Sequence, residues 1–363
     1  MKNVCLIVSN KIGTFGDTDR GALSVFENGG YECAEIRLLR AIDGERLAAS
    51  VADCKRMYDN VILLAYGVPI LQLVEAASAG FGQEILSSSP SGAGIADDGE
   101  KTLFLLSYTD VSFAESVCLP RLVQKYGHRT GSIVLRCVGV DGERMTAALS
   151  KAENMAAGRA SIRCSNKYGE DVIRVFYDEN TPKMLTDDLL RFFADELSDN
   201  LYALDDTPLE NQLIELLRLR RKTLSVAESF TGGGIARKIV SVSGASEVYR
   251  EGLNTYADGS KMQRLGVTEY TLRSQGAVSE QTAYEMAAGL LSQGNCTVSI
   301  ATTGLAGPKD DGSGLPIGTC YIAVGIDESV YVYRYVLQGD REEITETAIR
   351  YALFLACKKL KNM

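Results

Sequence analysis

The stretch that most constrains the fold of this chain is an apolar run that leads into a glycine-rich turn and then a helix. Residues 223–227 read Thr-Leu-Ser-Val-Ala, a β-branched and apolar pattern typical of a buried strand. Residues 228–234 form a turn rich in hydroxyls and glycines, and residues 235–240 show a helical pattern. The first N–H groups of a helix lack partners and glycines admit close contact, so this unit is a potential small-anion site.

A second interpretation stays open for this turn, namely that its glycines serve tight packing alone. Neither of the two standard nucleotide-binding motifs, G-x-G-x-x-G and G-x-x-x-x-G-K-[S/T], matches it. The stretch continues with the hydroxyl of Ser246, the phenol of Tyr256 and the amine of Lys261. Three potentially reactive groups thus follow the potential anion site in sequence, so this stretch is the strongest candidate for a functional site.

The length of the chain predicts two or three domains, because 363 residues exceed what one hydrophobic core usually holds. We find no apolar run of about 18 residues and no signal-peptide pattern, so we expect a cytoplasmic protein without membrane contact. The net charge of -9 argues against a nucleic-acid surface. Nine cysteines without regular spacing indicate buried thiols in a reducing compartment, rather than disulfides or a metal site.

The chain contains a single histidine, His128, within a loop-like segment at residues 125–130. It is far in sequence from the glycine-rich turn, and we expect it to lie in a surface loop. A Ser-His-Asp or Cys-His enzyme would need to bring this residue across domains. Any hydrolytic chemistry here therefore needs a lysine, a tyrosine or a carboxylate as its base.

Strand and helix patterns divide the chain into three predicted domains, residues 1–127, 128–205 and 206–363. The first alternates strands with helices, which predicts a parallel α/β sheet whose ligands bind at the carboxyl ends of the strands. The second is a small α+β module without catalytic signals. The third opens with a predicted capping box, in which Thr207 is the N-cap and Glu210 its partner. The expected fold class is therefore multi-domain α/β.

The third domain resembles the C-terminal domain of the CinA family, the nicotinamide-nucleotide amidases. Seven short motifs stand in the family's order: Ala227-Glu228-Ser229-x-Thr231-Gly232-Gly233, Gly244-x-Ser246, Tyr256-x-x-x-x-Lys261, Gly276-Ala277-Val278-Ser279-Glu280, Gly304-x-Ala306-Gly307-Pro308, Pro316-x-Gly318-Thr319 and Gly339-Asp340-Arg341. Two departures lie among them. Phe230 replaces the usual cysteine, and residues 258–260 read Asp-Gly-Ser where Asn-Glu-Ala is typical.

The strand–helix order of residues 1–205 is similar to the rest of the family's layout, a molybdopterin-binding-like domain and a small α+β module. The family's G-G-x-G-P-T-x-D-D signature should fall near residues 64–71, which here read Leu-Ala-Tyr-Gly-Val-Pro-Ile-Leu. Its P-G-V-P-x-E-M signature should fall near residues 107–115, which lack that pattern. We therefore expect a divergent molybdopterin-binding-like domain that has lost the family's metal-dependent hydrolysis of ADP-ribose and keeps a structural or dimerising role.

The resemblance implies an amidase that converts nicotinamide mononucleotide to nicotinate mononucleotide and ammonia. It places Ser246 as the nucleophile, Lys261 as its base and Tyr256 as a group that relays or positions the proton. Such a scheme needs no cofactor and no metal, and it requires a lysine whose pKa is lowered toward neutrality. Structural interpretations stay open for three residues: Ser246 as a turn cap, Tyr256 as a core aromatic and Glu228 as a structural hydrogen-bond acceptor.

The resemblance also implies a substrate-binding set that spans the turn, a later loop and the last helix: Ser229, Thr231, Gly232, Gly233, Gly304 and Arg341. The substrate phosphate is expected on the helix start at Thr231 to Gly233, with the hydroxyl of Ser229 as a donor. Arg341 would contact the phosphate or stabilise developing negative charge, and the loop from Gly304 would shape the ring pocket.

Two other functions stay open at this stage. One is an ADP-ribose pyrophosphatase in the N-terminal domain, and the other is a non-catalytic protein of competence or damage regulation. The presence of Ser246, Tyr256 and Lys261 together argues against a catalytically dead site. The expected partners are a nucleotide substrate and further copies of the same chain, in a homodimer or larger homo-oligomer implied by the resemblance.

Overall fold

A computed structural model describes residues 2–10, 21–40, 43–87, 89–126, 131–309 and 312–362. The chain forms two compact units. The first contains Met1–Ser132 and Phe176–Thr181, and the second contains Ile133–Val175 and Pro182–Met363. Three sheets occur in the described residues, which confirms the predicted multi-domain α/β class. The finer division into three domains stays a prediction.

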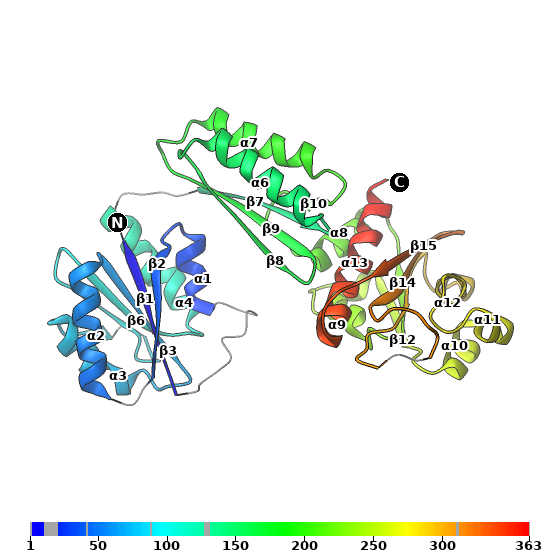
Figure 1. The fold of residues 1–363 in the computed structure, drawn as a ribbon, viewed down its shortest axis with the longest axis horizontal. Helices are drawn as coiled ribbons and strands as arrows, with labels where there is room; N and C mark the ends of the chain where they lie inside the picture. Colours follow the sequence, from blue (N-terminus) through cyan, green and yellow to red (C-terminus); the bar gives the residue numbers. More distant parts are fainter. Residues whose placement is uncertain are drawn as a thin grey trace. The chain divides into compact units, whose positions relative to one another are not determined.

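The first unit is built on a six-stranded sheet in the order β2-β1-β3-β6-β5-β4 (Figure 1). Strands β2, β1, β3 and β6 run parallel, as predicted, whereas β5 pairs antiparallel with β6, and β4 pairs antiparallel with β5. The strands are β1 Asn3–Ser9, β2 Cys33–Arg40, β3 Asn60–Tyr66, β4 Leu86–Ser87, β5 Gly94–Asp97 and β6 Thr102–Ser107. The helices are α1 Gly21–Asn28, α2 Gly44–Met57, α3 Leu71–Phe81, α4 Val111–Phe113 and α5 Leu119–Tyr126, with a π-helical turn at Ala114–Cys118.

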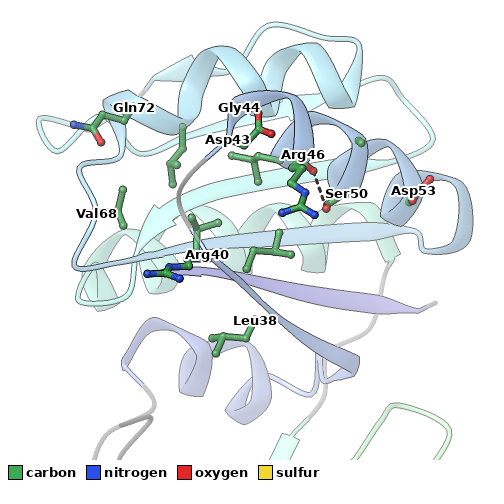
Figure 2. Close-up of a pocket in the computed structure, with 14 residues that line it drawn as sticks. Leu38, Arg40, Asp43, Gly44, Arg46, Ser50, Asp53, Val68 and Gln72 are labelled. Atoms are coloured by element: carbon green, nitrogen blue, oxygen red, sulfur yellow. Dashed lines mark hydrogen bonds between the residues drawn. The ribbon is translucent and has the colours of Figure 1, made fainter. Parts of the chain in front are cut away.

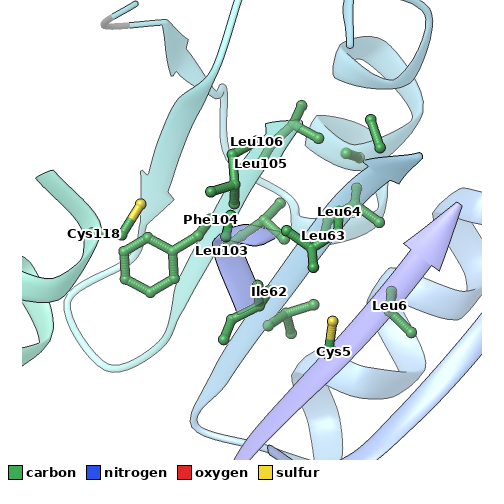
Figure 3. Packing of buried hydrophobic residues seen from close by; sticks show 14 of the residues in the cluster. Cys5, Leu6, Ile62, Leu63, Leu64, Leu103, Phe104, Leu105, Leu106 and Cys118 are labelled. Atoms are coloured by element: carbon green, nitrogen blue, oxygen red, sulfur yellow. The ribbon is translucent and has the colours of Figure 1, made fainter. Parts of the chain in front are cut away.

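The central strands of this sheet are apolar on both faces, because helices cover both sides of it. Figure 3 shows Leu6, Ile62 and Phe104 in this core, all fully buried. On one face α2 and α3 approach so closely that Gly80 has no room for a side chain. A Cβ on Gly80 would lie 2.3 Å from the backbone oxygen of Ala48, so glycine is required there.

The second unit contains two sheets. A four-stranded sheet in the order β10-β7-β9-β8 comprises β7 Gly131–Val138, β8 Ser161–Lys167, β9 Glu170–Tyr177 and β10 Leu201–Ala203, with helices α6 Gly142–Ala156 and α7 Lys183–Glu196 (Figure 1). This is the predicted small α+β module. A five-stranded sheet has the order β12-β11-β13-β14-β15, with β11 Leu224–Glu228, β12 Tyr249–Asn254, β13 Val298–Gly304, β14 Thr319–Ile326 and β15 Ser329–Val336.

Helices cover both faces of the five-stranded sheet. They are α8 Leu209–Leu219, α9 Gly234–Val240, α10 Asp258–Leu265, α11 Glu269–Ser274, α12 Glu280–Ser292 and α13 Arg341–Lys361, with a 3-10 turn at Ala245–Glu247. Residues of α8, α9 and α13 pack with Val226 and Ile300 in one core, and residues of α12 pack with Ala227 and Ala301 in the other. Strands β12, β11 and β13 are parallel, so their carboxyl ends meet at one edge.

Two helix starts differ in how they are capped. Ser279 is the N-cap of α12, and its Oγ accepts a hydrogen bond of 3.2 Å from Thr282 N. The predicted capping box at Thr207 is wrong, because α8 begins one residue later and Pro208 is its N-cap, without a side-chain bond. Thr207 N instead donates to Asp205 Oδ1 at 2.9 Å, so a local turn takes the place of the cap.

The turn between β8 and β9 packs against the long helix α13. Tyr168 Oη donates to Glu342 Oε1 at 3.1 Å, and Arg350 Nε pairs with Glu170 Oε2 at 3.4 Å. Between them, a Cβ on Gly169 would lie 3.0 Å from the ring of Tyr351, so the backbone of the turn lies directly on the helix. The small module and the five-stranded domain are thus joined through one side of α13.

Candidate active site

The candidate site lies where β12, β11 and β13 end. Thr255 N donates to Glu228 O at 2.8 Å, and Ser229 N donates to Thr302 O at 3.1 Å, so the three chain segments that leave these strands stay side by side. In open α/β sheets, ligands bind at the carboxyl ends of the strands. This edge gathers most of the residues that the sequence predicts for the site.

The turn after β11 is filled by a carboxylate of the protein itself. The buried side chain of Glu228 accepts N–H bonds from Gly233 at 3.1 Å, from Ile235 at 3.0 Å and from Ala236 at 2.9 Å. These are donors at the start of α9 that a phosphate would need. The Glu228 carboxylate thus acts as a structural acceptor and occupies the N–H of Gly233, while a phosphate at Thr231, Gly232 and Gly233 stays a prediction.

Lys261 is the most unusual side chain at this edge. Only 1% of its surface is exposed, and its Nζ donates to Tyr256 O at 3.0 Å and lies 3.6 Å from Asp258 Oδ1. Burial lowers the pKa of the Lys261 ammonium below its usual value, and the nearby Asp258 carboxylate opposes the shift. A lysine with a lowered pKa is available as a neutral base more often than an exposed lysine.

The lowered pKa of Lys261 has a consequence for stability. The folded state disfavours the ammonium, so stability should rise with pH between the lowered pKa and the ordinary lysine value of about 10.4, because the unfolded chain binds more protons there. Unfolding by urea at several pH values tests this, with Lys261→Met as the comparison. We expect wild type to gain stability relative to the variant as pH rises. A difference that stays constant with pH would contradict a buried, titrating Lys261.

Ser246 lies at the other end of β12. It is exposed in the 3-10 turn Ala245–Glu247 that precedes the strand, whereas Lys261 follows the strand. Strand β12 has 6 residues, and a strand rises about 3.3 Å per residue, so the two side chains are separated by roughly 20 Å within one chain. Within one chain, Ser246 and Lys261 thus flank opposite ends of β12, and their catalytic pairing stays a prediction.

Ser229 is the serine that shares the edge with Lys261. It is buried and follows β11 directly, next to Glu228. Glu228 is paired with Asn254 in the sheet, so Ser229 and Tyr256 both follow just beyond this pair, at the ends of neighbouring strands. The carbonyl of Tyr256 in turn accepts the hydrogen bond from Lys261. The sequence predicts Ser229 only as a phosphate contact. The sequence signal for a catalytic role is the position of Ser229 directly after a buried strand, on the edge where Lys261 also lies.

The phenol of Tyr256 is 65% exposed, so the interpretation of this residue as a core aromatic is wrong. Its backbone carbonyl, rather than its ring, holds Lys261 in place. The side chain is exposed to solvent on the edge where β12 ends. This position suits contact with a substrate better than a buried proton relay.

Gly304 and Arg341 complete the edge on the side of β13. A Cβ on Gly304 would lie 2.9 Å from the ring of Phe230 and 2.7 Å from Cys320 Cβ, so the glycine permits close packing beside the residue that follows Ser229. Arg341, the first residue of α13, donates from Nη1 to Gly307 O at 2.7 Å. The structure thus joins Arg341 to the loop after β13, and the start of that loop packs beside Phe230, the residue after Ser229.

A cavity of about 740 Å3 opens in the first unit at the carboxyl end of β2 (Figure 2). Arg40 from β2 and Arg46 from α2 line it beside apolar residues such as Leu38. Asp43 also lines it, but its side chain accepts a hydrogen bond from Glu45 N as the cap of α2. Asp53 lines it as well, so the formal charges of two arginines and two aspartates balance in this cavity.

Two further observations concern the described part of the chain. Its residues include no group of three or more His, Cys, Asp or Glu placed to hold a metal ion. None of its helices is long and apolar enough to cross a membrane. His128, predicted to be a surface loop residue, lies outside the described residues.

Comparison with known proteins gives a consistent set of matches. The model of the CinA C-terminal domain matches residues 206–360. A protein of Clostridium acetobutylicum named as competence-damage inducible is 30% identical over 276 residues, which are 74% of this chain and 67% of that protein. A protein of Thermoanaerobacter pseudethanolicus with the same name is 41% identical over 157 residues, 43% of this chain and 38% of that protein. The chain thus spans well under half the length of the latter.

A solved structure of a CinA superfamily protein from Klebsiella pneumoniae is 31% identical and covers 43% of this chain and 97% of its own, with a TM-score of 0.42.

Proposed function

This chain belongs to the CinA family, and we propose that residues 206–363 hydrolyse the carboxamide of nicotinamide mononucleotide to nicotinate mononucleotide and ammonia. The observation that carries the proposal is the buried Lys261, with its lowered pKa, at the same sheet edge as the buried Ser229. Amide hydrolysis needs a nucleophile and a base in one place, and this edge supplies both.

We assign the nucleophile to Ser229 rather than Ser246. Neutral Lys261 takes the proton of the Ser229 hydroxyl while Oγ attacks the carboxamide carbon. The lysine then gives this proton to the leaving nitrogen, which departs as ammonia and leaves an ester on the serine. Water, deprotonated by Lys261, hydrolyses the ester and restores the hydroxyl. This scheme uses no metal and no cofactor.

The substrate phosphate is assigned to Arg341 instead of the start of α9. The helix start is already filled by Glu228, whose negative charge would repel a phosphate. Arg341 is exposed at the edge and is anchored to the loop after β13 through Gly307 O, which leaves further guanidinium donors for an anion. Tyr256, which is exposed beyond the end of β12, is proposed as a substrate contact.

The test is ammonia release by the full chain from nicotinamide mononucleotide, with free nicotinamide as the control substrate and with or without EDTA. We expect release from the nucleotide only, at a rate that EDTA does not change. No release from the nucleotide would contradict the assigned substrate. A rate that falls on addition of EDTA would contradict the serine–lysine scheme.

For residues 1–127 we propose a structural or dimer-forming role without ADP-ribose hydrolysis. The segment that follows β3 supports this role, because Tyr66, Gly67 and Val68 supply no acidic group at the edge where ligands of such sheets bind. A homodimer in the cytoplasm, with a nucleotide as the small-molecule partner, belongs to the same proposal.

A further inference from the structure

One motif of the C-terminal domain has no part in the proposed amidase reaction, and it forms the wall of a separate cavity. Residues 276–280 line a cavity of about 910 Å3 together with α11, the first turns of α12 and residues of β14 and β15. Thr303 Oγ1 donates to Ala277 O at 2.6 Å, which fixes this wall to the end of β13. Neither Ser229 nor Lys261 lines the cavity.

The wall is held in place by its own hydrogen bonds. Ser279 Oγ and Thr282 Oγ1 both donate to Gly276 O, at 2.9 and 2.8 Å. On the next turn, Gln281 Nε2 and Thr271 Oγ1 donate to Glu285 Oε1 at 2.9 and 2.6 Å, which ties α12 to α11. The cavity is therefore preformed, and its volume falls in the range typical of small-molecule sites.

The lining is aromatic and acidic. Three tyrosines face the cavity, Tyr270 from α11, Tyr284 from α12 and Tyr321 from β14. Glu280 and Glu285 add two carboxylates, and the described lining residues include no lysine or arginine. Within the described residues, the Glu280 carboxylate has no hydrogen bond or ion pair, so it is available to a ligand.

The cavity places a carboxylate beside an aromatic ring, and the nearby Arg334 does not line it. Glu280 and Tyr284 are four residues apart on α12, so they lie on the same face of the helix. Arg334, which is opposite Tyr321 in the β14–β15 ladder, is exposed and does not line the cavity. The faces of aromatic rings attract cations, and a neighbouring carboxylate strengthens this attraction.

We propose that this cavity binds a planar organic cation, of the pyridinium or guanidinium kind. A flat, delocalised cation can stack its face on a tyrosine ring. Its positive charge then lies close to the Glu280 carboxylate. Neither Ser229 nor Lys261 lines this cavity, so the proposal does not depend on the amidase reaction.

Calorimetric titration of the full chain tests the proposal, in a Ser229→Ala background that prevents turnover at the other site. The probes are 1-methylnicotinamide, a pyridinium cation, methylguanidinium, and nicotinamide, which has the same ring as the first probe without the charge. We expect at least one cation to bind about tenfold more tightly than nicotinamide. The tighter of the two cations identifies whether the site prefers pyridinium or guanidinium.

Three substitutions locate the binding. Glu280→Gln removes the charge and keeps the size, and Ser279 still caps the helix. Tyr284→Ala removes one ring, and Tyr331→Ala serves as the matched control, because Tyr331 is 41% exposed, Tyr284 is 43% exposed and Tyr331 does not line this cavity. We expect the first two to weaken cation binding about fivefold each, and the control to leave it unchanged. Equal binding of nicotinamide, no detectable binding of either cation, or wild-type binding by both variants would overturn the proposal.

Discussion

Alanine at Ser229 or at Lys261 is expected to reduce kcat for ammonia release from nicotinamide mononucleotide by at least about a thousandfold. The first change removes the nucleophile and the second removes the base. Alanine at Ser246 is expected to keep kcat within about twofold of wild type, because this residue lies at the far end of β12 from Lys261. The three variants are compared in one assay at saturating substrate.

The contrast between the two serines decides the assignment. The double variant Ser229→Ala with Lys261→Ala should lose little more than either single variant, since residues that act as a unit are not additive. Thermal unfolding of each variant checks that the fold is kept. A Ser246→Ala variant as inactive as Lys261→Ala, beside an active Ser229→Ala variant, would return the nucleophile to Ser246 and require a second copy of the chain to bring the groups together.

Glutamine at Glu228 is expected to lower the free energy of unfolding by about 2–4 kcal/mol. The Glu228 carboxylate accepts three N–H bonds at the start of α9 and is buried. A glutamine amide has one oxygen to accept them, and its NH2 group would face another donor. At least one buried N–H is then left without an acceptor.

Urea unfolding measures this change, with Glu215→Gln as the matched control. Glu215 is an exposed glutamate of α8, so the same substitution there should change stability by less than about 0.5 kcal/mol. Because Ser229 follows Glu228 directly, the Glu228→Gln variant should also lose activity at temperatures where it remains folded. Equal stability of the two variants would mean that the three bonds contribute little.

The sequence predicted the strand–turn–helix unit around Glu228 and the multi-domain α/β class, because strong apolar patterns mark both. It did not reveal strand β12, whose residues alternate between half-buried and exposed and include Arg250 and Glu251. Without that strand, Ser246 and Lys261 look like neighbours in one loop region. A polar edge strand has little hydrophobic pattern, and this is why the distance between the two residues was missed.

The role of Glu228 shows a different limit of the sequence. A glycine-rich helix start predicts an anion, and the anion proves to be a side chain of the same turn. Pattern alone does not tell a site that awaits a ligand from one that the chain fills itself, because both use the same glycines and the same open N–H groups. The cavity lined by residues 276–280 shows a related limit. The motif at these residues is visible in the sequence, but the cavity also needs tyrosines from three separate elements, which the sequence does not show to be close together.

The packing of the β8–β9 turn on α13 affects how the chain can be divided. Helix α13 contributes one side to the core of the five-stranded domain, and its other side receives Tyr168 and Gly169. A fragment that begins at α8 would uncover the ring of Tyr351 and leave Glu342 and Arg350 without their partners from that turn. A fragment of this domain should therefore begin before β7. It then includes the small module, whose β8–β9 turn continues to cover the side of α13 that carries Tyr351.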